Sequence, residues 1–91
     1  MSLTKNEIKF LKSLQTKGQR EESKLFVVEG EKMVNELFIQ TKFEINIIYF
    51  TEDYDVNLIP NSVNSQQIAN KDLDRITSFK KANKVLAVVN Q

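Results

Sequence analysis

A buried strand that turns directly into a helix is indicated by residues 25–34, which read Leu25-Phe26-Val27-Val28-Glu29-Gly30-Glu31-Lys32-Met33-Val34. A helix that begins at such a turn exposes the N–H groups of its first turn, which can meet an anionic ligand. A glycine at the turn lets another backbone or a ligand approach closely. The turn therefore suits a nucleotide, an RNA phosphate, or compact folding alone, and the rest of the chain has to decide between them.

Composition limits what the chain can be. Its 91 residues, 41% apolar and 27% charged, predict one soluble domain with a single modest core. Cysteine is absent, which excludes disulfides, thiol nucleophiles and Cys-based zinc sites and favours a reducing compartment, so we expect a cytoplasmic protein. Histidine is also absent, and with it the commonest general base and metal ligand. The sequence has neither a membrane-spanning apolar run nor an apolar signal core.

The net charge of +1 conceals an uneven distribution. Residues 1–24 carry six cations and three anions, a net +3, whereas residues 25–70 carry two cations and seven anions, a net −5. Residues 71–91 carry five cations and two anions, a net +3 again. If the two ends meet on one side of the fold, a mildly basic face lies opposite an acidic one, although solvated helices also carry many lysines.

Hydrophobic periodicity predicts alternating helices and strands. A capping box at Thr4 and Glu7 begins a helix that we expect to stop at Gly18. Strands are predicted at 25–29, buried on both faces, at 44–50 and at 84–89, with a short edge strand near Val63. Two further helices are expected, one over 31–40 and one with Asn70 as N-cap. Their core-facing side chains are predicted to be Met33, Val34, Leu37 and Phe38 in the first and Leu73, Ile76 and Phe79 in the second.

This order of elements predicts a three-layer α/β/α sandwich with a small, mainly parallel or mixed sheet. Many unrelated functions occur on such a fold, so the fold alone names none.

Catalytic constellations are not evident in the sequence. Gly30 stands alone, without the further glycines of a dinucleotide-binding or phosphate-binding loop. The acidic cluster at residues 52–55 lacks the spaced ligands and loop glycine of a cation site and is expected to be a solvated loop. Glu29 and Glu31 flank the turn, where capping or a salt bridge explains them more simply than acid–base chemistry. These patterns favour binding over catalysis.

Basic side chains gather in two segments that we expect to be loops: Lys17, Arg20 and Lys24 before the first strand, and Lys80, Lys81 and Lys84 before the last. Lysine meets a phosphate as a flexible point charge, whereas arginine grips one bidentately. Arg20 is one of two arginines among thirteen cations, which indicates a planar partner. That partner is either an internal carboxylate, such as Glu29 or Glu31, or RNA.

At this point the sequence resembles a known family. Lys17-Gly18-Gln19-Arg20, followed by residues 24–36, is similar to the opening of the SpoU/TrmH family of RNA 2′-O-methyltransferases. There a basic loop with an arginine precedes a strand ending in Phe, two apolar residues, Glu and Gly, and then a helix. Residues 83–89 resemble the strand that closes the N-terminal substrate-binding domain of that family. The resemblance covers nearly the whole chain, in order and at matching spacing.

The resemblance implies a fold like that of small RNA-binding ribosomal proteins and a role in positioning RNA, either rRNA or tRNA. In the family a second, knotted domain binds S-adenosylmethionine, transfers the methyl group to a ribose 2′-hydroxyl, and forms the homodimer. Its asparagine-rich and glycine-rich motifs have no counterpart here. We therefore expect residues 1–91 to be the RNA substrate-binding domain of a longer enzyme, with no catalytic site or cofactor of its own.

The RNA-binding residues that we predict share a position in or beside the two basic segments and the turn: Lys17, Arg20, Lys24, Gly30, Lys32, Lys80, Lys81 and Lys84. One departure from the family concerns residues 81–84, Lys81-Ala82-Asn83-Lys84, where the family often has a proline and a glycine. Two alternatives remain open: a protein-interaction or dimerisation module, and a standalone ribosome-associated RNA-binding protein.

Overall fold

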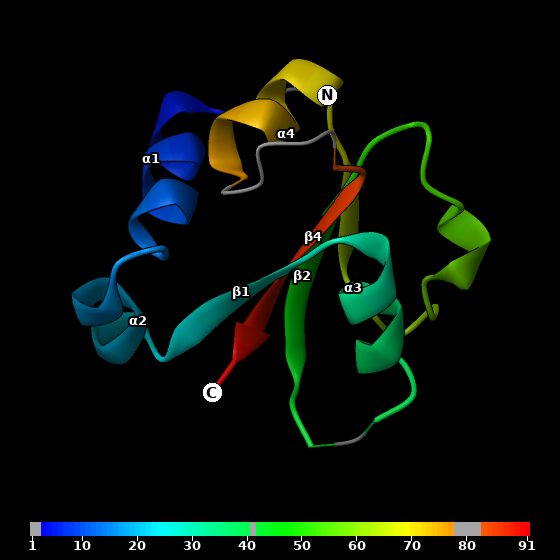
Figure 1. The fold of residues 1–91 in the computed structure, drawn as a ribbon, viewed down its shortest axis with the longest axis horizontal. Coiled ribbons are helices and arrows are strands. Elements are labelled where there is room, and N and C mark those ends of the chain that lie inside the picture. The colour runs from blue at the N-terminus through cyan, green and yellow to red at the C-terminus, as the bar shows by residue number, and fades with distance from the viewer. Residues whose placement is uncertain (1–2, 41, 78–82) are drawn as a thin grey trace.

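A computed structural model of the chain describes residues 3–40, 42–77 and 83–91. Within these ranges the chain alternates helices and strands around one sheet (Figure 1). In chain order the elements are α1 (Lys5–Ser13), α2 (Lys17–Ser23), β1 (Leu25–Glu29), α3 (Glu31–Leu37), β2 (Ile45–Phe50), the short 3-10 helix η1 (Val56–Leu58), β3 (Ser65–Gln67), α4 (Asn70–Ile76) and β4 (Val85–Asn90). No helix of the described residues is long and apolar enough to cross a membrane.

The four described strands are ordered β1-β4-β2-β3 in a mixed sheet. β4 pairs antiparallel with both β1 and β2, and only β2 and β3 pair in parallel. Of the two sheet types that we predicted, mixed is therefore confirmed and mainly parallel is wrong. β1, β2 and β3 do run in one direction, but the last strand inserts between the first two and runs against them. The predicted short edge strand near Val63 corresponds to β3, a three-residue strand at the sheet edge that begins two residues further on.

Helices cover both faces of the sheet, which confirms the three-layer arrangement (Figure 1). On one face α1 and α4 pack side by side over one apolar cluster. On the other face α3 and the segment between β2 and β3 cover a second cluster. The first cluster contains Leu3, Leu11, Leu14, Tyr49, Ile68, Leu73, Ile76, Leu86 and Val88, and the second contains Val34, Ile48, Phe50, Tyr54, Ile59, Val85, Ala87 and Val89.

β4 is the centre of this core because it contributes to both clusters. Its side chains alternate between the faces, as strand geometry requires: Leu86 and Val88 point to the α1/α4 face, and Val85 and Val89 to the α3 face. All of these are at most 2% exposed. An irregularity in the pairing of β2 between Ile45 and Ile47 breaks the alternation there, so that these two side chains pack on opposite faces.

The first helix ends earlier than the sequence predicts. The capping box at Thr4 and Glu7 is confirmed, with hydrogen bonds of 2.9 and 3.1 Å. α1 nevertheless stops at Ser13, and Gly18 is not a stop but the second residue of α2. The physical cause is Thr16, whose hydroxyl oxygen accepts from the backbone N–H of Gln19 and caps a new helix.

Strand β1 is half-buried, so the prediction that it is buried on both faces is wrong. Among the described strands it lies at the edge of the sheet and pairs with β4. Helix α3 turns Val34 to the core, but Met33 is 55% exposed and the predicted core position is wrong. A helix presents only part of its surface to a sheet, and Met33 lies outside that stripe, where it lines a pocket with Phe26 and Val28 of β1. α3 also ends at Leu37, three residues before the predicted end.

Helix α4 begins one residue earlier than predicted, at the residue that was expected to be its cap. The N-cap is Ala69, which has no side-chain hydrogen bond, and Asn70 is the first helical residue. Leu73 and Ile76 are buried as predicted, whereas Phe79 lies outside the described residues. Asp72 is 2% exposed and accepts a 3.2 Å hydrogen bond from the backbone N–H of Leu3. This bond fixes the start of the described chain against α4.

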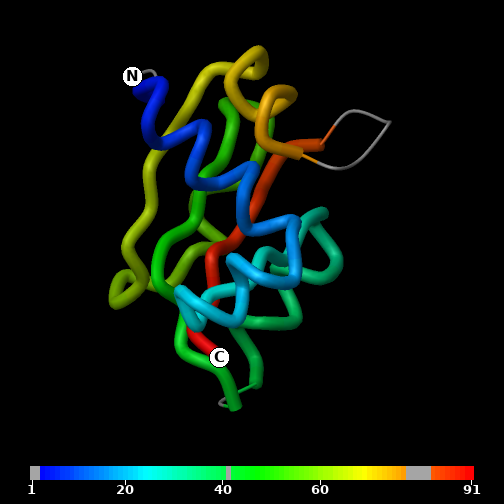
Figure 2. Tube along the Cα trace, turned by 90° about the vertical axis from the view of Figure 1, so that its left-hand side faces the viewer, coloured from blue at the N-terminus to red at the C-terminus, as the bar shows by residue number. Residues whose placement is uncertain are grey.

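Helices from both basic ends of the sequence lie on one side of the fold, which is the condition under which the charge pattern gives a basic face. α1, α2 and α4 all belong to the α1/α4 side, while the acidic middle of the chain supplies α3 and the segment before β3 on the other side. Gln91 closes this arrangement with a 2.8 Å bond from its N–H to the carbonyl of Lys24. Figure 2 shows the C-terminus lying beside the passage from α2 into β1.

Candidate nucleic-acid interface

The first predicted basic segment is a helix instead of a loop. Lys17 is the first residue of α2, Arg20 lies in its middle, and Lys24 is its C-cap. The Lys17 side chain is 82% exposed and lies 4.0 Å from the Glu21 carboxylate one turn later, a pair worth a few tenths of a kcal/mol at most. Lys24 adopts the left-handed conformation, with φ 62°, that ends many helices. The helix holds these cations in fixed relative positions that a loop would not provide.

Arg20 is half-buried and lines a pocket between α2 and β1. Its Nη1 donates a 3.3 Å hydrogen bond to the carbonyl of Gln15, which holds the guanidinium over the break between α1 and α2. Gln15 is itself held by a 3.0 Å bond from its amide to the carbonyl of Ile76 on α4. Gln15 was not predicted as a site residue. Its only signal in the sequence is its position directly before the capping residue of α2.

The pocket beside Arg20 has a volume of about 280 Å³ and is lined by Leu14, Gln15, Arg20, Val27 and Glu29. The sequence leaves two kinds of partner open for Arg20: an internal carboxylate, such as Glu29 or Glu31, and RNA. The structure places Glu29 in the same pocket as Arg20. Glu29 accepts hydrogen bonds at Oε1 from the hydroxyl of Thr77 and, at 3.5 Å, from the amide of Asn83. These two partners follow α4 and precede β4, so their contact with Glu29 exists only in the folded chain.

The turn after β1 has a clear structural role. Gly30 has φ 93° and ψ 146°, a backbone conformation that side chains disfavour, and its N–H donates a 3.2 Å bond to the carbonyl of Val85. The helix that follows places an acidic residue, Glu31, in its first turn. Glu31 forms a salt bridge of 3.4 Å with Lys84, which agrees with the prediction that capping or a salt bridge explains this carboxylate more simply than acid–base chemistry. Lys32 is exposed on the same turn.

The predicted cations do not all converge. Register pairs Leu25 with Asn90 and Glu29 with Leu86, so Lys24 and Lys84 lie at opposite ends of β1. Five strand residues separate these ends by roughly 15 Å. Arg20 lies between the Lys24 end and the Lys84 end of β1, because the pocket that Arg20 lines extends to Glu29 at the end of this strand. Lys80 and Lys81 lie outside the described residues.

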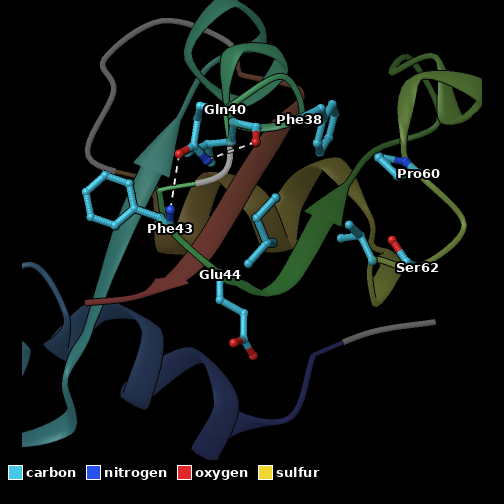
Figure 3. A pocket seen from close by; sticks show the side chains of 9 residues that line it. Phe38, Gln40, Phe43, Glu44, Pro60 and Ser62 are labelled. Atoms are coloured by element: carbon cyan, nitrogen blue, oxygen red, sulfur yellow. Dashed lines mark hydrogen bonds between the residues drawn. The ribbon is translucent and has the colours of Figure 1, made fainter.

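A second pocket lies on the opposite, α3 side and is a weaker candidate for RNA (Figure 3). It has a volume of about 330 Å³ and lies between the connection from α3 to β2 and the segment around Pro60. The Gln40 side chain hydrogen-bonds within its own loop. Its oxygen accepts from the N–H of Phe43 at 3.1 Å, and its amide donates to the carbonyl of Leu37. The charged side chain in its lining is Glu44, which repels phosphate.

The acidic cluster at residues 52–55 takes part in the local structure of its own loop. Asp55 caps η1 by accepting a 3.0 Å hydrogen bond from the N–H of Asn57. Within residues 3–40, 42–77 and 83–91, no group of three or more acidic side chains is placed to hold a metal ion.

Comparison with solved structures identifies the class of the fold. The chain superposes on a protein described as an RNA methyltransferase of the TrmH family from Porphyromonas gingivalis, with a TM-score of 0.79, 24% identity, and coverage of 99% of this chain and 36% of that one. It also matches an rRNA methyltransferase from Sinorhizobium meliloti bound to AdoMet, with a TM-score of 0.75, 19% identity, and coverage of 100% and 35%.

A third match is the SpoU methyltransferase AviRb from Streptomyces viridochromogenes in complex with AdoMet, with a TM-score of 0.69, 15% identity, and coverage of 92% and 32%. This chain therefore spans about a third of the length of each of these proteins. No curated protein sequence matches it significantly. At these identities the matches show a shared fold over about a third of each of these proteins.

The family follows from the sequence itself. Residues 5–87 match the model of the MRM3-like substrate binding domain. The match covers nearly the whole chain, and the chain belongs to this family. The resemblance drawn from residues 17–36 and 83–89 is thereby confirmed at the level of a substrate-binding domain.

Proposed function

We propose that this chain is the RNA-recognition domain of an S-adenosylmethionine-dependent RNA 2′-O-ribose methyltransferase acting on rRNA or tRNA. The observation that carries this proposal is the match of residues 5–87 to a substrate-binding domain family. The fold shared with proteins described as TrmH, SpoU and rRNA methyltransferases supports it. The domain would present RNA to a catalytic domain, within a parent enzyme that works as a homodimer in the cytoplasm.

The methyl donor belongs to that catalytic domain. Two of the matched proteins hold AdoMet, and both extend well beyond the part that this chain covers. The two glycines of this chain lie inside α2 and at the end of β1, with no glycine-rich loop to cradle a nucleoside. We therefore assign AdoMet to no residue of this chain.

RNA is proposed to bind on the side that carries α2. Lys17, Arg20 and Lys24 would contact it first, because α2 holds them on one short helix on the basic side of the fold. Lys32 and Lys84 would extend the contact past Gly30, with Lys84 weakened by its pair with Glu31. Lys80 and Lys81 stay predictions from the sequence. With so few cations, binding by the isolated domain is expected to be weak and strongly salt-dependent.

A filter-binding titration of a structured RNA hairpin at low and moderate salt tests the proposal. Replacing a lysine that neutralises one phosphate should make the slope of log K against log salt less steep by about 0.7–0.9. We expect Lys17→Gln and Lys24→Gln to reduce both affinity and slope. Lys42→Gln is the matched control, because Lys42 is an exposed lysine on the connection from α3 to β2, on the other side of the sheet.

Two outcomes would contradict RNA recognition. The first is the absence of binding even at low salt, and the second is equal loss of affinity in all three variants. Light scattering distinguishes the dimerisation alternative, since a tight dimer without RNA affinity would favour it.

A further inference from the structure

Helix α1 presents a row of lysines that the sequence-based prediction of RNA contacts did not include. Lys5, Lys9 and Lys12 follow each other at spacings of four and three residues, which places them on one face of the helix. All three are exposed, and none of them forms a salt bridge with a residue in the described part of the chain. The row therefore gathers three cations that the described fold leaves without ion-pair partners.

This row lowers the stability of the helix instead of raising it. Like charges four residues apart repel each other, as Lys5 and Lys9 do. Lys5 is also the first residue of α1, where a cation is unfavourable with the helix dipole, whereas Lys12 in the last turn is favourable. Glu7, the acidic residue of the first turn, belongs to the capping box with Thr4. Local folding thus does not account for Lys5 and Lys9, whereas an external anion does.

An aromatic ring is exposed on the same helix. Phe10 lies about 100° round the helix from Lys9, and its side chain is 40% exposed. Within the described residues, the other exposed large apolar side chains belong to α3, the connection that follows it and η1, all on the opposite side of the sheet: Met33, Ile39, Phe43, Val56 and Leu58. Phe10 is set apart from these because it lies on the basic side of the fold.

Helices α1 and α2 adjoin each other on that side. Residues 14–16 separate them, and the Arg20 side chain donates to the carbonyl of Gln15 across this break. Both helices lie on the left in Figure 1 and in front in Figure 2, which shows the molecule from that side. The exposed surface of α1 therefore continues the surface on which Lys17 and Lys24 are proposed to contact RNA.

We propose that Lys5, Lys9, Lys12 and Phe10 form a second RNA contact, which binds a single-stranded segment. The lysines contact its phosphates, and the Phe10 ring stacks on an unpaired base. Proteins that bind single strands combine cations along the backbone with aromatic rings on which bases stack. The cations near the ring match a polyanion, which decides for RNA over an apolar protein surface. The inference rests on the proposed function and deepens it, because it names unpaired nucleotides as part of the substrate.

The test compares two RNAs with the same number of nucleotides, a hairpin with a loop of unpaired purines and a blunt duplex. Affinities for the 91-residue chain are measured by fluorescence anisotropy at low salt. Because only the hairpin offers a base that can stack on the ring, Phe10→Ala should weaken hairpin binding by about 5-fold or more and leave duplex binding unchanged. The ratio of the two affinities is measured on one preparation, so a partly unfolded variant lowers both affinities alike.

Phe43→Ala is the matched control for the aromatic ring. Phe43 is also 40% exposed, but it lies on the connection from α3 to β2, on the other side of the sheet. Its replacement should leave the ratio of hairpin to duplex affinity unchanged. An equal change of this ratio in Phe10→Ala and Phe43→Ala would contradict a specific role of Phe10.

The phosphate contact is tested with Lys9→Gln, which keeps a good helix former and removes the charge. It should weaken binding to both RNAs and make the slope of log K against log salt less steep by about 0.7–0.9. Lys42→Gln again serves as the control on the other side of the sheet.

The outcomes separate this inference from the proposed function. An unchanged ratio of hairpin to duplex affinity in Phe10→Ala would overturn base stacking. Equal slopes in Lys9→Gln and Lys42→Gln would overturn the phosphate contact of α1. Both results leave RNA recognition through α2 standing. Failure of the unaltered chain to bind either RNA at low salt would overturn the proposed function, and this inference with it.

Discussion

The phenol of Tyr54 donates a 2.6 Å hydrogen bond to the side-chain oxygen of Asn35, which ties the segment after β2 to helix α3. The Tyr54 ring is 4% exposed and packs beside Phe50, with 6.4 Å between ring centroids. Tyr54→Phe keeps the ring and removes the donor. It should lower the free energy of unfolding by about 0.5–1.5 kcal/mol in urea titrations. In a double-mutant cycle Asn35→Ala should lose most of its effect once Tyr54 is Phe, whereas full additivity would contradict the coupling.

Stability should fall as the pH rises above about 10 because of two tyrosines. Burial, followed by the charge of Glu7, raises the pKa of Tyr49 above its ordinary value of 10.0. Burial, followed by Glu31 and Asp55, does the same for the pKa of Tyr54. The folded chain keeps these phenol protons where the unfolded chain releases them. This contribution is therefore complete below pH 10 and is lost as the pH rises through the folded pKa values.

Urea unfolding at about pH 8 and about pH 11 measures this dependence. The control is the chain with both Tyr49→Phe and Tyr54→Phe. It lacks the two phenols but keeps every other group whose charge changes over this pH interval. We expect its stability to decrease less over that interval. An equal decrease in both chains would show that the tyrosines do not contribute.

The two glycines should respond to alanine in opposite directions. Gly30 has φ 93°, where an alanine is strained, so Gly30→Ala should lower the free energy of unfolding by about 1–3 kcal/mol. Gly18 lies inside α2, and a Cβ there would meet nothing within 4 Å. Gly18→Ala should raise stability by about 0.5–1 kcal/mol, since alanine favours the helix. Thermal or urea unfolding of the two variants measures this, and changes of the same sign would contradict the assignment.

Lys24 offers a way to separate stability from binding. Its left-handed conformation costs a lysine about 1–2 kcal/mol, a cost that glycine does not have. Lys24→Gly should therefore unfold at higher urea concentration than the parent chain while binding RNA more weakly, because one proposed phosphate contact is lost. Lys24→Gln loses the same charge without the gain in stability. A more weakly binding but more stable chain excludes unfolding as the cause of the binding loss.

Local features of the fold were predictable from short stretches of sequence. The strand at 25–29 and the helix start after Gly30 depend on residues within a few positions of each other, and both are confirmed. The break between α1 and α2 also has a local signal, Thr16 followed three residues later by Gln19. It was missed because Gly18, a common helix stop, stood inside the same stretch. Two competing local signals gave the wrong boundary.

Long-range features were not predictable in the same way. The apolar run at the end of the chain indicates a strand but not that it inserts between β1 and β2. The pocket that joins Arg20 to Glu29 likewise depends on how α2 folds back along β1. The sequence raised Glu29 as a possible partner of Arg20, yet Gln15, Thr77 and Asn83 carry no sign of their contacts. Pairing across 48 residues, as between Glu29 and Thr77, arises only from the tertiary fold.

The central position of β4 governs when this domain can exist during its own synthesis. β1 and β2 find their shared neighbour only in residues 85–90, so the middle of the sheet cannot close until those residues have left the ribosome. At about 5–20 residues per second, the apolar strand at 25–29 waits several seconds without its partner. The edge of β1 is thus exposed longest to other nascent chains. A chain cut before Val85 would leave β1 without its partner strand and β2 paired only with β3.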